Sequence, residues 1–123
     1  MGKSALISTI VDSYSEGNVT GIEDIGGLVG ENSSSVITDS YAEGIITGTN
    51  YVGGLVGYSL NNSNVENSSS TSNVTGDENI GGLVGENSFG SIINESYAEG
   101  TVIGIKNVGG LVGCAQWKGN ESV

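Results

Sequence analysis

The chain lacks proline, histidine and arginine, and it has only three lysines and one cysteine among its 123 residues. A single cysteine cannot form an internal disulfide. Without histidine or arginine, the chain lacks the side chains that most often act as general bases and anion clamps. Three lysines against 14 acidic residues, a net charge of -11, also exclude a cationic surface for nucleic-acid phosphates. We therefore expect neither an enzyme nor a nucleic-acid-binding protein, with no cofactor and no metal.

Long apolar segments are absent as well. No stretch approaches the roughly 18 apolar residues of a transmembrane helix, so we expect no membrane insertion. Glycine is abundant instead, with 22 residues, and serine, threonine and asparagine fill much of the remainder. This composition disfavours helices and suits short strands joined by turns. The sequence therefore predicts an all-β fold.

An internal repeat organises the chain. Gly-Gly-Leu-Val-Gly occurs four times, and the copies follow one another at intervals of 27, 28 and 28 residues. Counting back from each copy gives a gap-free unit at 10–30, 37–57, 65–85 and 93–113. Besides the block, two columns are identical in all copies: Ser13, Ser40, Ser68 and Ser96, and Gly21, Gly48, Gly76 and Gly104. The connecting stretches are rich in Asn, Ser and Gly and are predicted loops: 31–36, 58–64 and 86–92.

A unit of this length without helical periodicity indicates one coil of a parallel β-solenoid. Two or three strands of four to six residues plus corners account for it. We predict a short right-handed solenoid of about four coils over 10–113, preceded by an entering segment, 1–9. The tail, 114–123, either folds over the last coil as a cap through Trp117 or frays.

Alternation along each coil separates an inner from an outer face. Ser13, Ser15, Gly17, Val19 and Gly21 share one face, which we expect to be inner, because burying stacked glutamates from the other face would be costly. The apolar columns headed by Ile10, Ile25, Leu28 and Val29 then fill the interior. Adjacent Leu28 and Val29 imply a corner or bulge, and the sequence leaves open which faces out. Asp12 shares parity with Ile10, so it is buried unless the register breaks there.

The repeat resembles the GLUG motif, a tandem Gly-Leu-hydrophobic-Gly repeat of bacterial and archaeal surface and adhesin-like proteins. All four Gly-Gly-Leu-Val-Gly blocks match, as do the Ser-Tyr-Ala-Glu-Gly segments at 40–44 and 96–100. The third copy departs, with Ser69 for Tyr and Ser72 for Gly. The resemblance implies an extracellular or cell-surface setting, an accessory non-catalytic role and no catalytic residues. We interpret the chain as a fragment of a longer secreted protein.

Three outward ladders are candidate sites. Aromatic rings stack on sugars and carboxylates accept hydroxyl hydrogen bonds, which suits a glycan or a host or cell-surface protein partner; the residues are Tyr14, Tyr41, Tyr97, Glu16, Glu43 and Glu99. Calcium is a weaker alternative for the carboxylates of Glu16 and Glu43 or of Asp12 and Asp39, because no calcium loop motif is present. Outward threonines predict an alternative ice-binding face: Thr20, Thr47, Thr75 and Thr101. Open coil ends predict end-to-end self-association.

Overall fold

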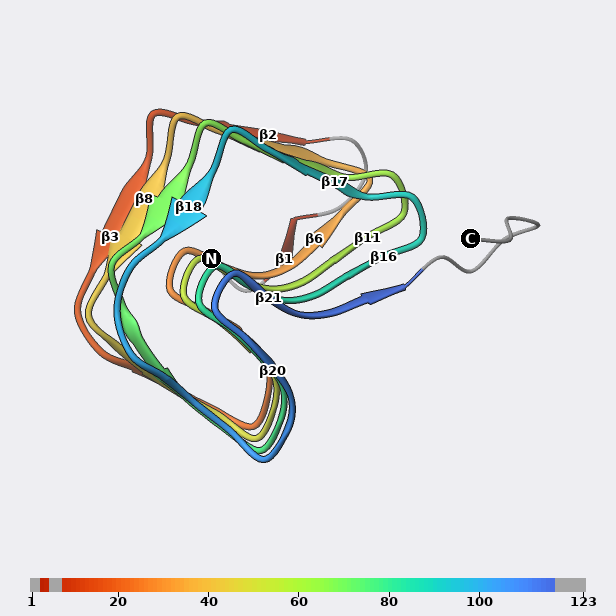
Figure 1. The fold of residues 1–123 in the computed structure, drawn as a ribbon. Coiled ribbons are helices and arrows are strands. Elements are labelled where there is room, and N and C mark those ends of the chain that lie inside the picture. Colours follow the sequence, from red (N-terminus) through yellow and green to blue (C-terminus); the bar gives the residue numbers. More distant parts are fainter. Residues whose placement is uncertain (1–2, 5–7, 117–123) are drawn as a thin grey trace.

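A computed structural model describes residues 3–4 and 8–116, and it shows an all-β chain wound into a solenoid of about four turns (Figure 1). Every described strand pair is parallel, as it must be when each coil lies on its predecessor. The described residues include no helix, and so none that could cross a membrane. The predicted fold class is therefore confirmed.

Each full coil contains five short strands. The first coil has β2 (Thr9–Val11), β3 (Tyr14–Glu16), β4 (Val19–Thr20), β5 (Glu23–Gly26) and β6 (Val29–Ser33). The second has β7 (Val36–Thr38), β8 (Tyr41–Glu43), β9 (Ile45–Thr47), β10 (Asn50–Gly53) and β11 (Val56–Leu60). The third has β12 (Asn64–Glu66), β13 (Ser69–Ser70), β14 (Asn73–Thr75), β15 (Glu78–Gly81) and β16 (Val84–Ser88). The fourth has β17 (Ile92–Asn94), β18 (Tyr97–Ala98), β19 (Val102–Ile103), β20 (Lys106–Gly109) and β21 (Val112–Gln116).

Equivalent strands of successive coils stack into five parallel sheets. The largest runs β1-β6-β11-β16-β21, where β1 (Lys3–Ser4) adds a strand before the first full coil. The register joins residues one coil apart, for example Val29 with Val56, Val56 with Val84, and Val84 with Val112. Identical residues therefore form straight columns along the solenoid, as the repeat predicts.

The predicted loops are wrong in part, and so is the expectation of two or three strands per coil. Strands β6, β11 and β16 run into the connecting stretches and end only at Ser33, Leu60 and Ser88. The polar side chains at these positions favour loops by composition. Stacking overrides that preference, because each coil offers the next one a full set of backbone hydrogen-bond partners whatever the side chains are.

The small-residue face points inward, as predicted. In the second coil Ser40, Ala42 and Ile46 are buried, while Tyr41 and Glu43 are exposed. Two apolar clusters form the core. The first contains Leu28, Val29, Ile37, Ala42, Leu55, Val56, Val65, Leu83 and Val84, and the second contains Ile46, Val52, Val74 and Ile80.

The Gly-Gly-Leu-Val-Gly block forms a corner between two sheets. Strand β10 ends at Gly53 and β11 begins at Val56, so Gly54 and Leu55 make the turn. Both Leu55 and Val56 are fully buried, because the chain changes direction between them. Neither residue of the pair faces out, which settles the question that the sequence left open.

A second corner explains how Asp12 avoids burial. Asp12 has a φ of 48° in the left-handed region, and the register breaks there, which leaves its side chain exposed. The same conformation recurs in each coil, at Asp39, Asn67 and Glu95. Aspartate and asparagine tolerate this region better than most residues, so this column reflects backbone geometry.

Candidate functional site

The tyrosine face is the exposed side of the sheet β18-β13-β8-β3, and we define it by the predicted residues Tyr14, Tyr41, Tyr97, Glu16, Glu43 and Glu99. The register pairs Tyr14 with Tyr41, Tyr41 with Ser69, and Ser69 with Tyr97. The three tyrosines are 63%, 42% and 56% exposed in chain order. The structure therefore brings them into one column, with Ser69 as the interruption.

Two of these tyrosines stack on each other. The ring centroids of Tyr14 and Tyr41 are 5.3 Å apart and the rings are inclined by only 10°. Strand spacing of roughly 4.8 Å brings equal aromatic side chains in register to this separation, and their packing sets the angle between the rings. The stack is a solvent-exposed aromatic surface at one end of the tyrosine face.

The glutamates form a parallel column two residues further along. Glu16 pairs in register with Glu43. Thr71 and Glu99 continue the column, since their backbone N–H groups donate to the carbonyls of Ala42 and Ser70 in the preceding coils. All four side chains are exposed, so water screens the repulsion between neighbouring carboxylates. Within residues 8–116 no group of three or more acidic or thiol side chains is clustered as metal ligands would be.

The threonines of the alternative face occupy two columns. Thr20 pairs with Thr47, Thr47 with Thr75, and Thr75 with Ile103. Thr101 lies in the neighbouring column, where its N–H donates to Asn73 Oδ1 at 2.9 Å. Three threonines are thus aligned, and the fourth position of their column is an exposed isoleucine.

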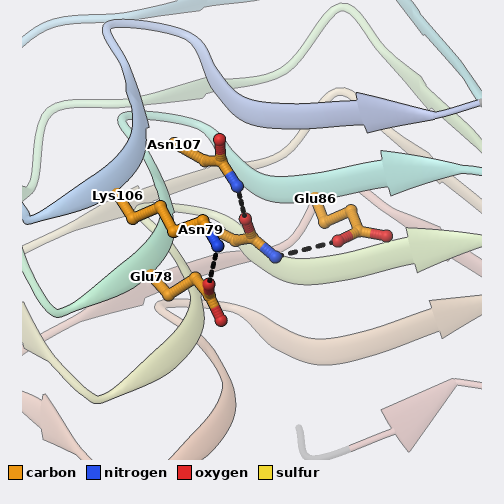
Figure 2. Close-up of polar contacts among 5 residues, drawn as sticks. All are labelled: Glu78, Asn79, Glu86, Lys106 and Asn107. Carbon is orange, nitrogen blue, oxygen red and sulfur yellow. Dashed lines mark hydrogen bonds and ion pairs between the residues drawn. The ribbon is translucent and has the colours of Figure 1, made fainter.

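A third feature, which the sequence analysis did not predict, is formed by residues that flank the Gly-Gly-Leu-Val-Gly corner on both sides. We call it the polar seam and define it by Tyr51, Tyr58, Asn79, Glu86 and Asn107. Figure 2 shows part of it: Asn107 Nδ2 donates to Asn79 Oδ1 at 2.8 Å, and Asn79 Nδ2 donates to Glu86 Oε1 at 2.9 Å. Beside it, Lys106 Nζ lies 3.2 Å from Glu78 Oε2 in an exposed ion pair (Figure 2).

Glu86 is only 5% exposed, and its second carboxylate oxygen accepts a hydrogen bond from Ser88 Oγ at 2.6 Å. A buried carboxylate needs such donors, because leaving it without them would cost several kcal/mol, roughly. Both oxygens of Glu86 are thus engaged within the chain. The arrangement supports a structural role for this acid, since the carboxylate is buried and both of its oxygens are held by side chains of the chain itself.

Tyr51 and Tyr58 stack in the seam, with centroids 5.0 Å apart and an inclination of 16°. Burial, and after it the Glu86 carboxylate, raises the pKa of Tyr58 to about 12. The same causes raise the pKa of Tyr51. Both pKa shifts favour the neutral form of the phenols.

A sequence signal for the seam exists. Its paired residues lie seven apart, on either side of the block: Tyr51 and Tyr58, and Asn79 and Glu86. Because the block folds the chain back, positions at this distance face each other across the corner. Cys114, half-buried, lies in the same column as Glu86. The tail or cap was predicted over 114–123, but residues 114–116 belong to strand β21 and pair with β16. Trp117 and the rest of that segment lie outside the described residues.

Comparison with known families gives a match to a repeat motif. The model of the GLUG motif matches three consecutive segments, residues 21–47, 48–75 and 76–103. No curated protein and no solved structure gives a significant match to the chain. The three segments together cover more than half of the chain, and each spans one coil of the solenoid.

Proposed function

Because the chain belongs to the GLUG-motif family, we propose that it is a non-catalytic, adhesive repeat module of an extracellular or cell-surface protein. In this proposal the tyrosine face binds a glycan. The solenoid acts as a rigid support that holds side chains from successive coils at fixed spacing. The same surface of tyrosine and carboxylate side chains also suits a protein partner, but the glycan accounts for more of its features.

The exposed Tyr14–Tyr41 stack is the observation that carries this proposal. Large aromatic side chains cost free energy when they are left in water. Sugar rings present C–H groups that pack on aromatic faces, and their hydroxyls donate to carboxylates. Glu16 and Glu43 lie in register two residues from the tyrosines and supply those acceptors.

Catalysis is a poor explanation of the same residues. Glycoside hydrolysis needs two carboxyl groups in different environments, one of them with a raised pKa, on either side of the substrate bond. Glu16, Glu43 and Glu99 instead repeat one exposed environment, coil after coil. Such a column can hold a ligand, but it does not distinguish an acid from a base.

A glycan array probed with the native chain and with Tyr41→Ala tests the proposal. We expect the variant to lose about two- to tenfold in affinity, since an aromatic stacking contact contributes about 0.5–1.5 kcal/mol. Ile105→Ala is a matched control, because Ile105 is an 82% exposed residue away from this sheet and its loss should leave binding unchanged. Equal binding by the native chain and Tyr41→Ala would remove the tyrosine face as the site.

Ice binding is the alternative, and the alignment of Thr20, Thr47 and Thr75 is its support. Thermal hysteresis by the native chain that is abolished by Thr47→Tyr would favour ice binding over the glycan proposal. We rank it second because Ile103 occupies the fourth position of this column.

A further inference from the structure

We propose that the interruption of the tyrosine column at Ser69 is itself a binding site that takes one pyranose ring bearing a protonated amino group. This inference rests on the proposed glycan-binding function and names the subsite and the sugar class. We call the site the tyrosine gap and define it by Tyr41, Ser69, Tyr97, Glu43, Thr71 and Glu99.

The width of the gap follows from the register. Tyr41 and Tyr97 lie on strands β8 and β18, with β13 between them, so their positions are two strand spacings apart, roughly 9.5 Å. Tyr14 covers one ring face of Tyr41 with nearly parallel rings. The opposite ring face of Tyr41 is therefore directed along the column, toward Ser69 and Tyr97. A ring between them needs a contact of roughly 3.5–4 Å on each side.

The floor of the gap is small and polar. Ser69 is half-buried, and it replaces the tyrosine found at the equivalent position of the other three copies. Two residues on, Thr71 replaces the glutamate of the other copies. Both changes lie in the same coil, so the space left by one missing ring is continuous with the space left by one missing carboxylate. Two hydroxyls line its floor as hydrogen-bond partners for sugar hydroxyls.

The charge at the gap selects among sugars. Glu43 and Glu99 are exposed and occupy the positions on either side of Thr71. The chain as a whole has a net charge of -11. A protonated amino group on the ring gains up to about fivefold in affinity from each exposed ion pair, and a uronate is repelled by similar factors. A neutral N-acetylated sugar should fall between these two.

A planar aromatic side chain would match the width of the gap, but it carries at most one hydrogen-bonding group, which is too few for the hydroxyls of Ser69 and Thr71 and the two carboxylates. A pyranose packs against both ring faces and forms hydrogen bonds with the polar groups. For this reason we assign the gap to a pyranose rather than to an aromatic residue of a partner protein.

The proposal can be tested by filling the tyrosine gap with a tyrosine side chain. Ser69→Tyr completes the column with the residue that the other three copies carry, so it should fold with an unchanged unfolding midpoint. Ile92→Tyr adds the same side chain at an exposed position of a different sheet and serves as the control. Calorimetric titration with glucosamine oligomers should show affinity reduced about five- to hundredfold by Ser69→Tyr, which removes the sugar's stacking contacts with both Tyr41 and Tyr97, and unchanged by Ile92→Tyr. For the native chain we expect glucosamine oligomers to bind tighter than N-acetylglucosamine oligomers, and galacturonic acid oligomers to bind weakest.

Three results would contradict the proposals, and each of them contradicts a different part. If Ser69→Tyr binds as well as the native chain or better, the sugar lies along the continuous tyrosine ladder, and the gap proposal is overturned while glycan binding stands. If galacturonic acid oligomers bind as tightly as glucosamine oligomers, the charge selection is overturned. If the native chain binds no glycan of the array, the proposed function itself fails, and the gap assignment falls with it.

Discussion

At the scale of single residues, the glycines of the repeated block are dictated by how closely one coil approaches the next. A Cβ on Gly54 would collide with the carbonyl oxygen of Gly82 in the following coil and with Ser70 Oγ across the interior. A Cβ on Gly57 would lie 2.6 Å from the backbone nitrogen of Ile25. Backbone atoms cannot move aside as side chains do, so any other residue forces the coils apart.

Substitution of Gly54 by alanine should therefore destabilise the fold by roughly 1–3 kcal/mol or more, the cost of overpacking. Gly110→Ala is the matched control: Gly110 is the same position of the last coil, and a Cβ there would meet nothing within 4 Å. Its effect should stay within about 0.5 kcal/mol. Urea unfolding of both variants measures the difference, and equal destabilisation would contradict the steric explanation.

At the scale of structural elements, the invariant serine is part of a hydrogen-bonded ladder that joins the coils at one corner. The N–H of Ser13 donates to Ser40 Oγ, that of Ser40 to Ser68 Oγ, and that of Ser68 to Ser96 Oγ. Each hydroxyl in turn donates to the carbonyl two residues earlier, as Ser68 Oγ does to Glu66 at 2.8 Å. The ladder satisfies backbone groups at a corner where the sheets are interrupted.

Ser68→Ala should cost about 1–3 kcal/mol, because it leaves the buried N–H of Ser40 without its acceptor. Ser13→Ala is the comparison, since the Ser13 hydroxyl makes an exposed bond to the Val11 carbonyl and its loss should cost no more than about 0.5 kcal/mol. The free energies of unfolding from denaturant titration decide between them. A cost for Ser13→Ala equal to that of Ser68→Ala would show that the ladder position has no importance.

At the scale of the whole molecule, the two ends of the solenoid differ from its middle. Strands β17, β18, β19 and β20 are the last in their sheets, and β2, β3, β4 and β5 are the first in theirs. In the fourth coil Val108 and Leu111 are 42% and 39% exposed, whereas their equivalents in the third coil, Ile80 and Leu83, are fully buried. Within residues 3–4 and 8–116 these strands have a neighbouring strand on one side only, and such edges beside exposed apolar side chains favour the addition of another coil.

We therefore expect the chain to associate end to end as its concentration rises, which light scattering across a dilution series would detect. Val108→Lys should weaken the association by about tenfold or more, because a lysine buried at the contact would cost several kcal/mol. Ile45→Lys introduces the same charge at a 51% exposed residue of the second coil, away from both end coils, and should have little effect. A monomer at every concentration would contradict the prediction.

The sequence alone was enough to predict the stacking and the direction of the side chains. Nearly equal spacing of identical blocks leaves few folds other than a solenoid, and alternation places Ser40 and Ala42 inside and Tyr41 and Glu43 outside because charges avoid the core. The alignment also showed Ser69 as the interruption of the tyrosine column. These features depend on periodicity, which the sequence carries directly.

Tertiary structure decided what depends on contacts across the corners. The burial of both Leu55 and Val56, the extension of β11 into a polar stretch, and the pairing of Asn79 with Glu86 all follow from how the two sheets meet at the glycine block. Composition alone predicts loops at such positions, because polar residues favour turns. In the folded chain these residues form hydrogen bonds with residues that the turn brings opposite them. The stacking of Tyr14 on Tyr41 likewise needs coordinates, since register brings two rings together but only packing sets their angle.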